Sequence, residues 1–330
     1  MTVATPDVGE SADLPSRSFP PGRQLWVVDV EAPPQRLAAF RILSGSFAIA
    51  YLLIRLPAFV ELSSRSAGFE GSGLAWFLAG PVAPWVVVAT IAVTIAAGVG
   101  YTTGAAFRLT GPVFAFGVLA LTSYRGSWGQ LLHFENLVTI HLLIVSLSPA
   151  ADRWSFDDRR RRRRGVVRPE RSPTAYGWPL ALASLVVVLT YVIAGVAKLR
   201  YGGVEWIFGD TLRNHVAYSA ARLDLLGGTP SPVAGWVVGL DVAWPVVAGA
   251  SVLIELAAPI ALLGGRWRTG WVVAVWLMHA GILVFMLVGF PYPLFLVAFA
   301  PFYRLERLGR LVGVRRVTAP GDVADVSGRP

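Results

Sequence analysis

Apolar residues along this chain fall into long blocks that polar and charged residues separate. Most blocks approach the roughly 20 residues that an α-helix needs to cross a bilayer. The pattern therefore predicts an all-α fold, a polytopic helical integral membrane protein with about eight transmembrane helices. The predicted spans are residues 37–54, 79–99, 104–121, 131–147, 178–199, 242–263, 270–288 and a shorter one at 293–302. Residues 233–241 form either a separate short helix or a continuation of the sixth span, which allows nine.

The predicted spans form one membrane domain between two polar tails. Residues 1–36 are rich in Pro, Ser and acidic groups and lack the basic-then-apolar order of a signal peptide, so we expect a disordered, uncleaved tail. Residues 37–303 contain all the predicted spans, and residues 304–330 form a basic tail. The expected organisation is a single transmembrane domain with two short extensions.

Basic residues predict the orientation of the spans. The loop after the fourth span carries an unbroken arginine run at 159–164, and the turn at 266–268 and the C-terminal tail lie on the same side if there are eight spans. Lys and Arg are enriched in cytoplasmic loops. We therefore expect a multi-pass protein of the cell membrane with both termini cytoplasmic.

Composition agrees with the membrane class, because hydrophobic residues make up 55% of the 330 positions and charged residues 15%. The net charge of +9 would suggest nucleic acid in a soluble chain, but the arginines cluster in short loops as orientation signals do, so no nucleic-acid partner is expected. Membrane lipids are the expected partners. The run at 159–164 is either a topology determinant or a site for anionic lipid or an acidic partner. The absence of cysteine excludes disulfides and thiolate chemistry.

Lys198, at the end of the fifth span, is the polar residue that most needs explaining. On a helix Tyr191, Gly195 and Lys198 share one face, at spacings of four and three. A lysine at a span end either snorkels to the interface or faces a polar cavity. Desolvation disfavours an ammonium, which would suit a lysine that acts as a base.

Other ionisable residues lie inside the neighbouring spans. In the fourth span His133, Asn136 and His141 occupy neighbouring sectors of one broad face, and Glu135 points elsewhere. The sixth span supplies Glu255 and the seventh His279. Such groups usually face a bundle interior or a cavity, although each also has an ordinary structural explanation, such as an ion pair between Glu255 and Arg266.

The string Tyr191-Val-Ile-Ala-Gly-Val-Ala-Lys198-Leu199 is followed by Glu205-Trp206 and Gly209. This segment resembles the helix end and following loop of the vitamin K-dependent gamma-glutamyl carboxylases and the bacterial HTTM (carboxylase-like transmembrane) proteins. Supporting pieces are Phe40-Arg41-Ile-Leu-Ser-Gly45, the His133 and Asn136 cluster, Glu255-Leu-Ala-Ala-Pro259, Met278-His279 and Gly289-Phe-Pro291.

The resemblance implies that Lys198 is the base that deprotonates a reduced quinone, a menaquinol or vitamin K hydroquinone-like molecule, which enters from the bilayer. It implies further catalytic roles for His133, Asn136 and His279. Tyr191, Gly195 and Glu255 would line the cofactor site, with no metal and with a lipid or peptide substrate. The chain departs from the carboxylases in having Ala197-Lys198 where they have two lysines, and in lacking their large domain outside the membrane.

Two further classes compete with this interpretation. A metal oxidase would need several His and carboxylate groups, but the chain has four histidines and no Glu-x-x-His or His-Glu-x-x-His pair. A non-catalytic transporter or assembly partner is the stronger alternative, since small DoxX-like membrane proteins carry a similar Ala-Gly-x-x-Lys-Leu string. We also expect Lys198, His133 and Asn136 to line a cavity open to the outer side, with His279 at its floor.

Overall fold

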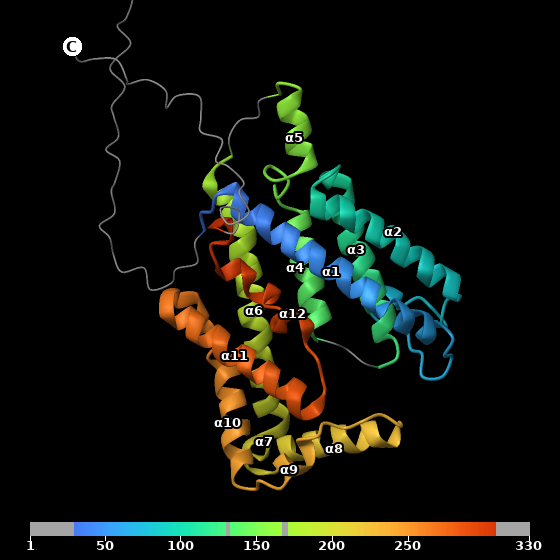
Figure 1. The fold of residues 1–330 in the computed structure, drawn as a ribbon, viewed down its shortest axis with the longest axis vertical. Helices are drawn as coiled ribbons and strands as arrows, with labels where there is room; N and C mark the ends of the chain where they lie inside the picture. The colour runs from blue at the N-terminus through green and yellow to red at the C-terminus, as the bar shows by residue number, and fades with distance from the viewer. Residues whose placement is uncertain (1–29, 130–132, 167–170, 308–330) are drawn as a thin grey trace, which may run out of the picture.

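The fold is known from a computed structural model, which describes residues 30–129, 133–166 and 171–307. The described part is all-helical and contains no strand (Figure 1), as the sequence predicts. The α-helices are α1 Pro34–Ser63, α2 Pro84–Thr103, α3 Phe107–Gly126, α4 His133–Ser146, α5 Phe156–Arg163, α6 Pro173–Gly202, α7 Glu205–Phe208, α8 Thr211–Leu225, α9 Ala234–Val238, α10 Ala243–Leu256, α11 Gly265–Met286 and α12 Pro291–Leu294. Four short 3₁₀ helices accompany them: η1 Gly73–Ala75, η2 Ala258–Leu263, η3 Val297–Phe302 and η4 Leu305–Arg307.

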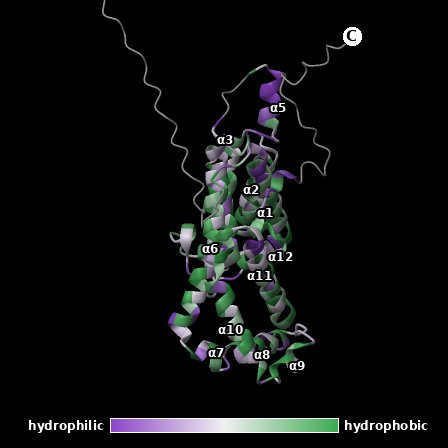
Figure 2. Ribbon diagram, turned by 90° about the vertical axis from the view of Figure 1, so that its left-hand side faces the viewer, coloured by the Kyte–Doolittle hydropathy of each residue, from purple (hydrophilic) through white to green (hydrophobic). Residues whose placement is uncertain are grey.

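Four of the described helices, α1, α2, α6 and α11, are long and apolar enough to cross a membrane. Shorter apolar helices cover Phe134–Ser146 and Ala243–Leu256. Apolar surface runs along the bundle, and the hydrophilic residues gather on α5 at one end (Figure 2). The chain is therefore a helical membrane protein, and the total of about eight spans stays a prediction.

Proline sets where several helices begin and where two predicted spans break. It occupies the first turn of α1, α2 and α6, where its missing N–H costs no hydrogen bond. The predicted span at 242–263 is instead α10 followed by η2, because Pro259 cannot continue the α-helical ladder. The predicted span at 293–302 is likewise divided between α12 and η3, at Leu296, whose φ is +62°. Residues 234–238 form the separate helix α9.

The two ends of the described chain lie near the start of α6, at the end of the bundle from which α5 projects (Figure 1). The Ala32 N–H donates to the carbonyl of Pro173 over 3.1 Å, and Arg36 forms a two-pronged ion pair with Glu306 at 2.9 Å. We call this the α5 end of the bundle. The helices α7, α8 and α9 lie at the other end, called the α8 end (Figure 1). Since α6 runs from the α5 end, its last turns carry Lys198 toward the α8 end.

Candidate functional site

Lys198 lies in the last two turns of α6, beside the end of α10. Its ammonium donates a hydrogen bond to Oε1 of Glu255 and forms an ion pair with that carboxylate. The side chain of Lys198 is 21% exposed and that of Glu255 6%. Lys198 is thus paired inside the bundle rather than extended toward the interface, and Glu255 pairs with Lys198 rather than with Arg266.

Gly195 allows α6 and α10 to approach closely enough for this ion pair. A Cβ atom at Gly195 would lie 3.0 Å from Cγ of Leu256 and 3.1 Å from Cβ of Glu255. The end of α10 is held in place by Trp271 of α11, whose indole N–H donates to the carbonyl of Ile254 over 2.9 Å. The last carbonyls of a helix lack partners within it, so this bond fixes the turn that carries Glu255.

Tyr191, one helical turn before Gly195 in α6, contacts His279 of α11. The Tyr191 hydroxyl and Nε2 of His279 share a hydrogen bond of 2.8 Å, and both side chains are buried. Aromatic rings surround the pair: Trp271 and Phe299 lie 5.3 Å and 6.3 Å from the Tyr191 ring, and Phe290 lies 4.9 Å from the imidazole. The predicted stripe of Tyr191, Gly195 and Lys198 therefore faces His279 and Glu255 directly.

Trp206, in α7, packs next to the ammonium of Lys198. The Lys198 ammonium lies 5.4 Å from the centre of its ring, within the range of a cation–π interaction. The ring also lies 5.8 Å from that of His215 in α8. The sequence motif includes Glu205-Trp206, but the sequence analysis predicted no role for the tryptophan. The short segment with Gly202 and Gly203 between Lys198 and Trp206 is the signal that could have predicted a contact between the two side chains.

Three buried polar atoms of this cluster have no hydrogen-bond partner among the described residues: Oε2 of Glu255, Nδ1 of His279 and Nε1 of Trp206. Buried polar groups are ordinarily paired, because an unpaired one loses its hydration without compensation. The carboxylate oxygen accepts, the indole N–H donates, and the imidazole nitrogen does either according to its tautomer. The cluster is therefore suited to a ligand that has both donor and acceptor oxygen atoms.

The predicted site residues of the fourth span are placed less completely. His133 is the first residue of α4, but its side chain lies outside the described residues. Asn136 is exposed, and nothing described joins it to Lys198. An aromatic connection does reach this helix end, since Phe290 lies between Phe134 and His279, with ring separations of 6.2 Å and 4.9 Å.

Sequence reasoning missed a second polar cluster, at the junction of α1, α3 and α4. Glu135, predicted to point away from the face of His133 and Asn136, is buried and accepts hydrogen bonds from Arg125 and Tyr51. His141 lies outside this cluster, farther along α4, where it is fully buried and bonded to the hydroxyl of Tyr292 in α12 at 2.8 Å and to the carbonyl of Ala183 in α6 at 3.2 Å. These contacts give Glu135 and His141 structural partners on neighbouring elements.

Within the described residues, no group of three His, Asp or Glu side chains is placed to hold a metal ion. The Lys198 cluster is instead built from one amine, one carboxylate, one imidazole, one phenol and one indole.

Comparison with known protein families matches residues 31–306 to the model of the HTTM domain. This match covers most of the chain. The protein belongs to the HTTM family. No curated protein and no solved structure matches the chain. Within this HTTM domain the Lys198 cluster joins α6, α7, α10 and α11, and the family assignment agrees with the resemblance that the Lys198 motif carries.

Proposed function

We propose that this HTTM protein carries out proton-transfer chemistry on a reduced quinone in the membrane, with Lys198 as the base. The observation that carries the proposal is the cluster itself: an ammonium, a carboxylate and an indole ring meet inside an apolar bundle, and three buried polar atoms here and on the adjoining His279 have no partner among the described residues. Among the described residues seven buried side-chain atoms have no hydrogen-bond partner, and these three gather around one ion pair, where a polar ligand would satisfy them.

The residues present fit a hydroxylated aromatic ring. Oε2 of Glu255 would accept a hydrogen bond from a ring hydroxyl, and the indole N–H of Trp206 would donate to a ring oxygen. The aromatic side chains of Trp271, Phe290 and Phe299 supply apolar walls near His279 and Tyr191. When bound, the quinol supplies an acidic hydroxyl and a reducing ring.

The role of Lys198 follows from its pairing with Glu255. A charged pair in low dielectric is stabilised by mutual attraction but has lost its hydration. Moving one proton from the ammonium to the carboxylate gives a neutral amine and a neutral acid, which removes both charges from the apolar interior. The free amine of Lys198 can then take a proton from the hydroxyl group next to it, and Glu255 holds the first proton.

His279 and Tyr191 extend this arrangement toward the middle of the bundle. Their shared hydrogen bond holds the imidazole through Nε2 and leaves Nδ1 available to a ligand. We propose that His279 orients the ring oxygen farther from Lys198. His133 and Asn136 stay proposed contributors from the start of α4.

The remaining proposals concern location. We propose that the protein lies in the cell membrane with both termini in the cytoplasm, so that the α8 end and Lys198 face outward. The lipid-soluble quinol would then reach the site from the bilayer, together with a lipid or peptide substrate.

Binding of a reduced quinone to the purified protein in lipid nanodiscs tests the proposal. We expect saturable binding to the wild type and binding about tenfold or more weaker for Glu255→Gln, because the amide removes the negative charge and half of the acceptor capacity. Arg200→Lys is the matched control, since Arg200 is an exposed cation two residues beyond Lys198 and should leave binding unchanged. Absence of saturable binding to the wild type would contradict the proposal.

A further inference from the structure

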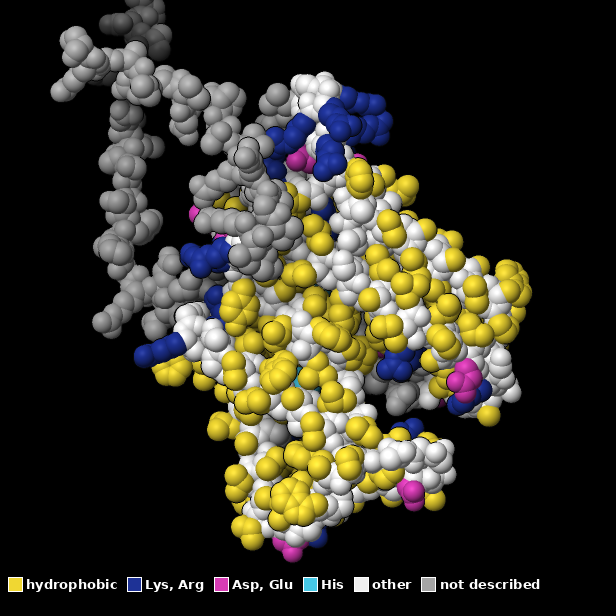
Figure 3. Space-filling view, in the orientation of Figure 1, with side chains coloured by type: hydrophobic (Ala, Val, Ile, Leu, Met, Phe, Trp, Pro, Cys, Tyr) yellow, Lys and Arg dark blue, Asp and Glu magenta, His cyan; other side chains and the backbone are white. Residues whose placement is uncertain are grey.

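The arginine-rich helix α5 lies at the opposite end of the bundle from Lys198 (Figure 1). The helix α5 projects from the bundle in both ribbon views (Figures 1 and 2). Lys and Arg side chains gather over it, whereas the flank of the bundle below is largely hydrophobic (Figure 3). A sequence that only sets topology needs no particular conformation. The order of α5 therefore calls for a separate explanation.

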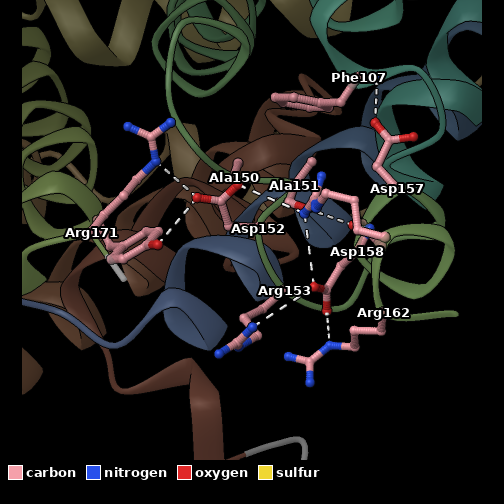
Figure 4. Close-up of polar contacts among 12 residues, drawn as sticks. Phe107, Ala150, Ala151, Asp152, Arg153, Asp157, Asp158, Arg162 and Arg171 are labelled. Atoms are coloured by element: carbon pink, nitrogen blue, oxygen red, sulfur yellow. Dashed lines mark hydrogen bonds and ion pairs between the residues drawn. The ribbon is translucent and has the colours of Figure 1, made fainter. Parts of the chain in front are cut away.

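Acidic side chains fasten the foot of α5 to the bundle (Figure 4). The carboxylate of Asp157 accepts the backbone N–H groups of Ala106 and Phe107, each over 3.0 Å, at the start of α3. Ser155 caps α5 by accepting the N–H of Asp158 over 2.9 Å. These bonds orient α5 relative to the membrane-spanning helices.

The loop that leads into α5 is fastened by Arg41 of α1. This fully buried guanidinium donates to the carbonyl of Ala150 over 2.8 Å and to that of Trp154 over 2.6 Å. Asp152 of the same loop pairs with Arg171 at 3.0 Å (Figure 4). The base of α5 is thus held from α1, from α3 and from the segment that begins α6.

The arginines of this region divide into two sets by their partners. Arg153, Arg161 and Arg162 lie within ion-pair distance of Asp158, the last at 3.0 Å. The second set is exposed and has no carboxylate within ion-pair distance among the described residues; we call it the free arginine set, and it consists of Arg159, Arg160, Arg163 and Arg164. Asp157 and Asp158 are engaged at the base of α5, so the four guanidinium groups of the free arginine set have no ion-pair partner among the described residues.

An exposed phenylalanine stands where α5 leaves the bundle. Phe156, the first residue of α5, is 55% exposed, and the guanidinium of Arg159 lies 5.9 Å from its ring centre. An exposed phenylalanine is typical of the boundary between lipid tails and headgroups. The eight residues of α5 extend about 12 Å beyond it, while the headgroup region on each side of a bilayer is roughly 5–8 Å thick. With Phe156 at that boundary, Arg159 and Arg160 would lie about 5–6 Å beyond it, within the headgroup layer, and Arg163 and Arg164 would lie at its outer surface.

We propose that the free arginine set is a binding site for anionic lipid headgroups in the leaflet on the α5 side. The planar guanidinium fork matches phosphate oxygens in a bidentate manner, and clustered arginines next to a transmembrane segment attract anionic lipid. Arg159, Arg160, Arg163 and Arg164 follow one another at helical spacings and share one broad face of α5. The hydrogen bonds and ion pairs at the base of α5 hold that face in one orientation relative to the bundle.

Lipid titration of the full-length protein in neutral detergent tests this proposal. We expect a fluorescent short-chain phosphatidylglycerol to bind the wild type about tenfold or more tightly than the corresponding phosphatidylcholine. The combined variant Arg159→Gln, Arg160→Gln, Arg163→Gln and Arg164→Gln should lose that preference, and the same four changes to Lys should keep part of it. The matched control is Arg65→Gln with Arg222→Gln, two exposed arginines that lie outside α5 and should leave the preference intact.

If the combined variant does not fold, the single variants Arg160→Gln and Arg163→Gln replace it. Each should weaken phosphatidylglycerol binding severalfold. Retention of the phosphatidylglycerol preference by the neutralised variants would overturn the proposal. Displacement of the lipid by inorganic phosphate at equal concentration would also overturn it and indicate a site for free phosphate. Displacement by poly-glutamate at equal concentration would instead indicate an acidic protein partner.

Discussion

At the scale of single residues, the arrangement around Lys198 depends on the absence of a side chain at Gly195. The stripe of Tyr191, Gly195 and Lys198 follows from helical periodicity alone, so sequence reasoning found it. Helical periodicity could not predict the partner of Lys198, because Glu255 lies 57 residues farther along the chain. Whether Glu255 pairs with Lys198 or with Arg266 depends on how α10 packs. Pairing across helices is decided by packing geometry, which a single sequence does not contain.

A substitution at Gly195 should separate the two helices. Gly195→Leu places atoms where Leu256 and Glu255 already lie, and overpacking of this kind costs about 1–3 kcal/mol. We expect a lowered midpoint of thermal unfolding and weaker quinol binding together. Gly281→Ala in α11 is the control, since a Cβ atom there would lie 3.7 Å from the ring of Phe285, an ordinary contact, and alanine favours helix over glycine by about 1 kcal/mol. An unchanged unfolding midpoint in Gly195→Leu would contradict the close approach of α6 and α10.

At the scale of helices and loops, buried arginine holds the connection between α4 and α5. Arg41 was noted in the sequence only as part of a first-span motif, and nothing in the pattern showed that it bonds two carbonyls more than 100 residues away. The positions of the long apolar helices follow from the apolar blocks, although their ends differ from the predicted ones by up to nine residues, as in α1. The polar helices α5 and α8 were not predicted, because a hydropathy pattern marks only apolar segments. The breaks after Leu256 and at Leu296 were missed because a broken and a continuous apolar segment have the same hydropathy.

Arg41→Met should destabilise the protein by about 2–4 kcal/mol, because it leaves the carbonyls of Ala150 and Trp154 without donors. Denaturant unfolding in mixed micelles measures the change. Arg55→Met is the control: Arg55 lies in the same helix, is partly exposed and donates no hydrogen bond within the described structure, so its loss should cost less than about 1 kcal/mol. Equal effects of the two variants would rule out the proposed role of Arg41.

The ion pair between Arg36 and Glu306 predicts a pH dependence. Partial burial raises the pKa of Glu306, but hydrogen bonds and positive charge from Arg36 outweigh it, so the pKa lies below its usual value of 4.5. A lowered carboxyl pKa stabilises the fold above the unfolded pKa, and this stabilisation is lost as the pH falls through the folded pKa. Between pH 7 and pH 3 the wild type should therefore lose more stability than Glu306→Gln. Parallel curves of unfolding midpoint against pH would show that the pair contributes nothing.

At the scale of the whole molecule, orientation in the membrane decides which side Lys198 approaches. The described chain ends and α5 lie at one end of the bundle, and the Lys198 cluster lies toward the other (Figure 1). A reporter enzyme fused at one end therefore reveals on which side of the membrane each of these features lies. Sequence reasoning predicted this shared side from the arginine distribution, while the number of spans could not be fixed because short helices such as α10 and α12 are ambiguous by length.

A periplasm-active phosphatase fused after Gly165 should be inactive, because arginine-rich loops stay in the cytoplasm. Gly165 is exposed and has a φ of +65°, so a fusion there disturbs little packing. The same enzyme fused after Gly227, at the α8 end, should be active. High activity after Gly165 with none after Gly227 would reverse the orientation and place Lys198 toward the cytoplasm.

The central claim, that Lys198 is a base rather than an anchor, is tested most directly by quinol turnover in Lys198→Arg. Arginine keeps the positive charge and can pair with Glu255, but it does not release a proton at neutral pH. With purified protein in nanodiscs, the loss of reduced quinone in air is followed by absorbance. We expect the wild type and Arg200→Lys to accelerate it equally, and Lys198→Arg to bind quinol but give no acceleration. Equal turnover by the wild type and Lys198→Arg would contradict the account.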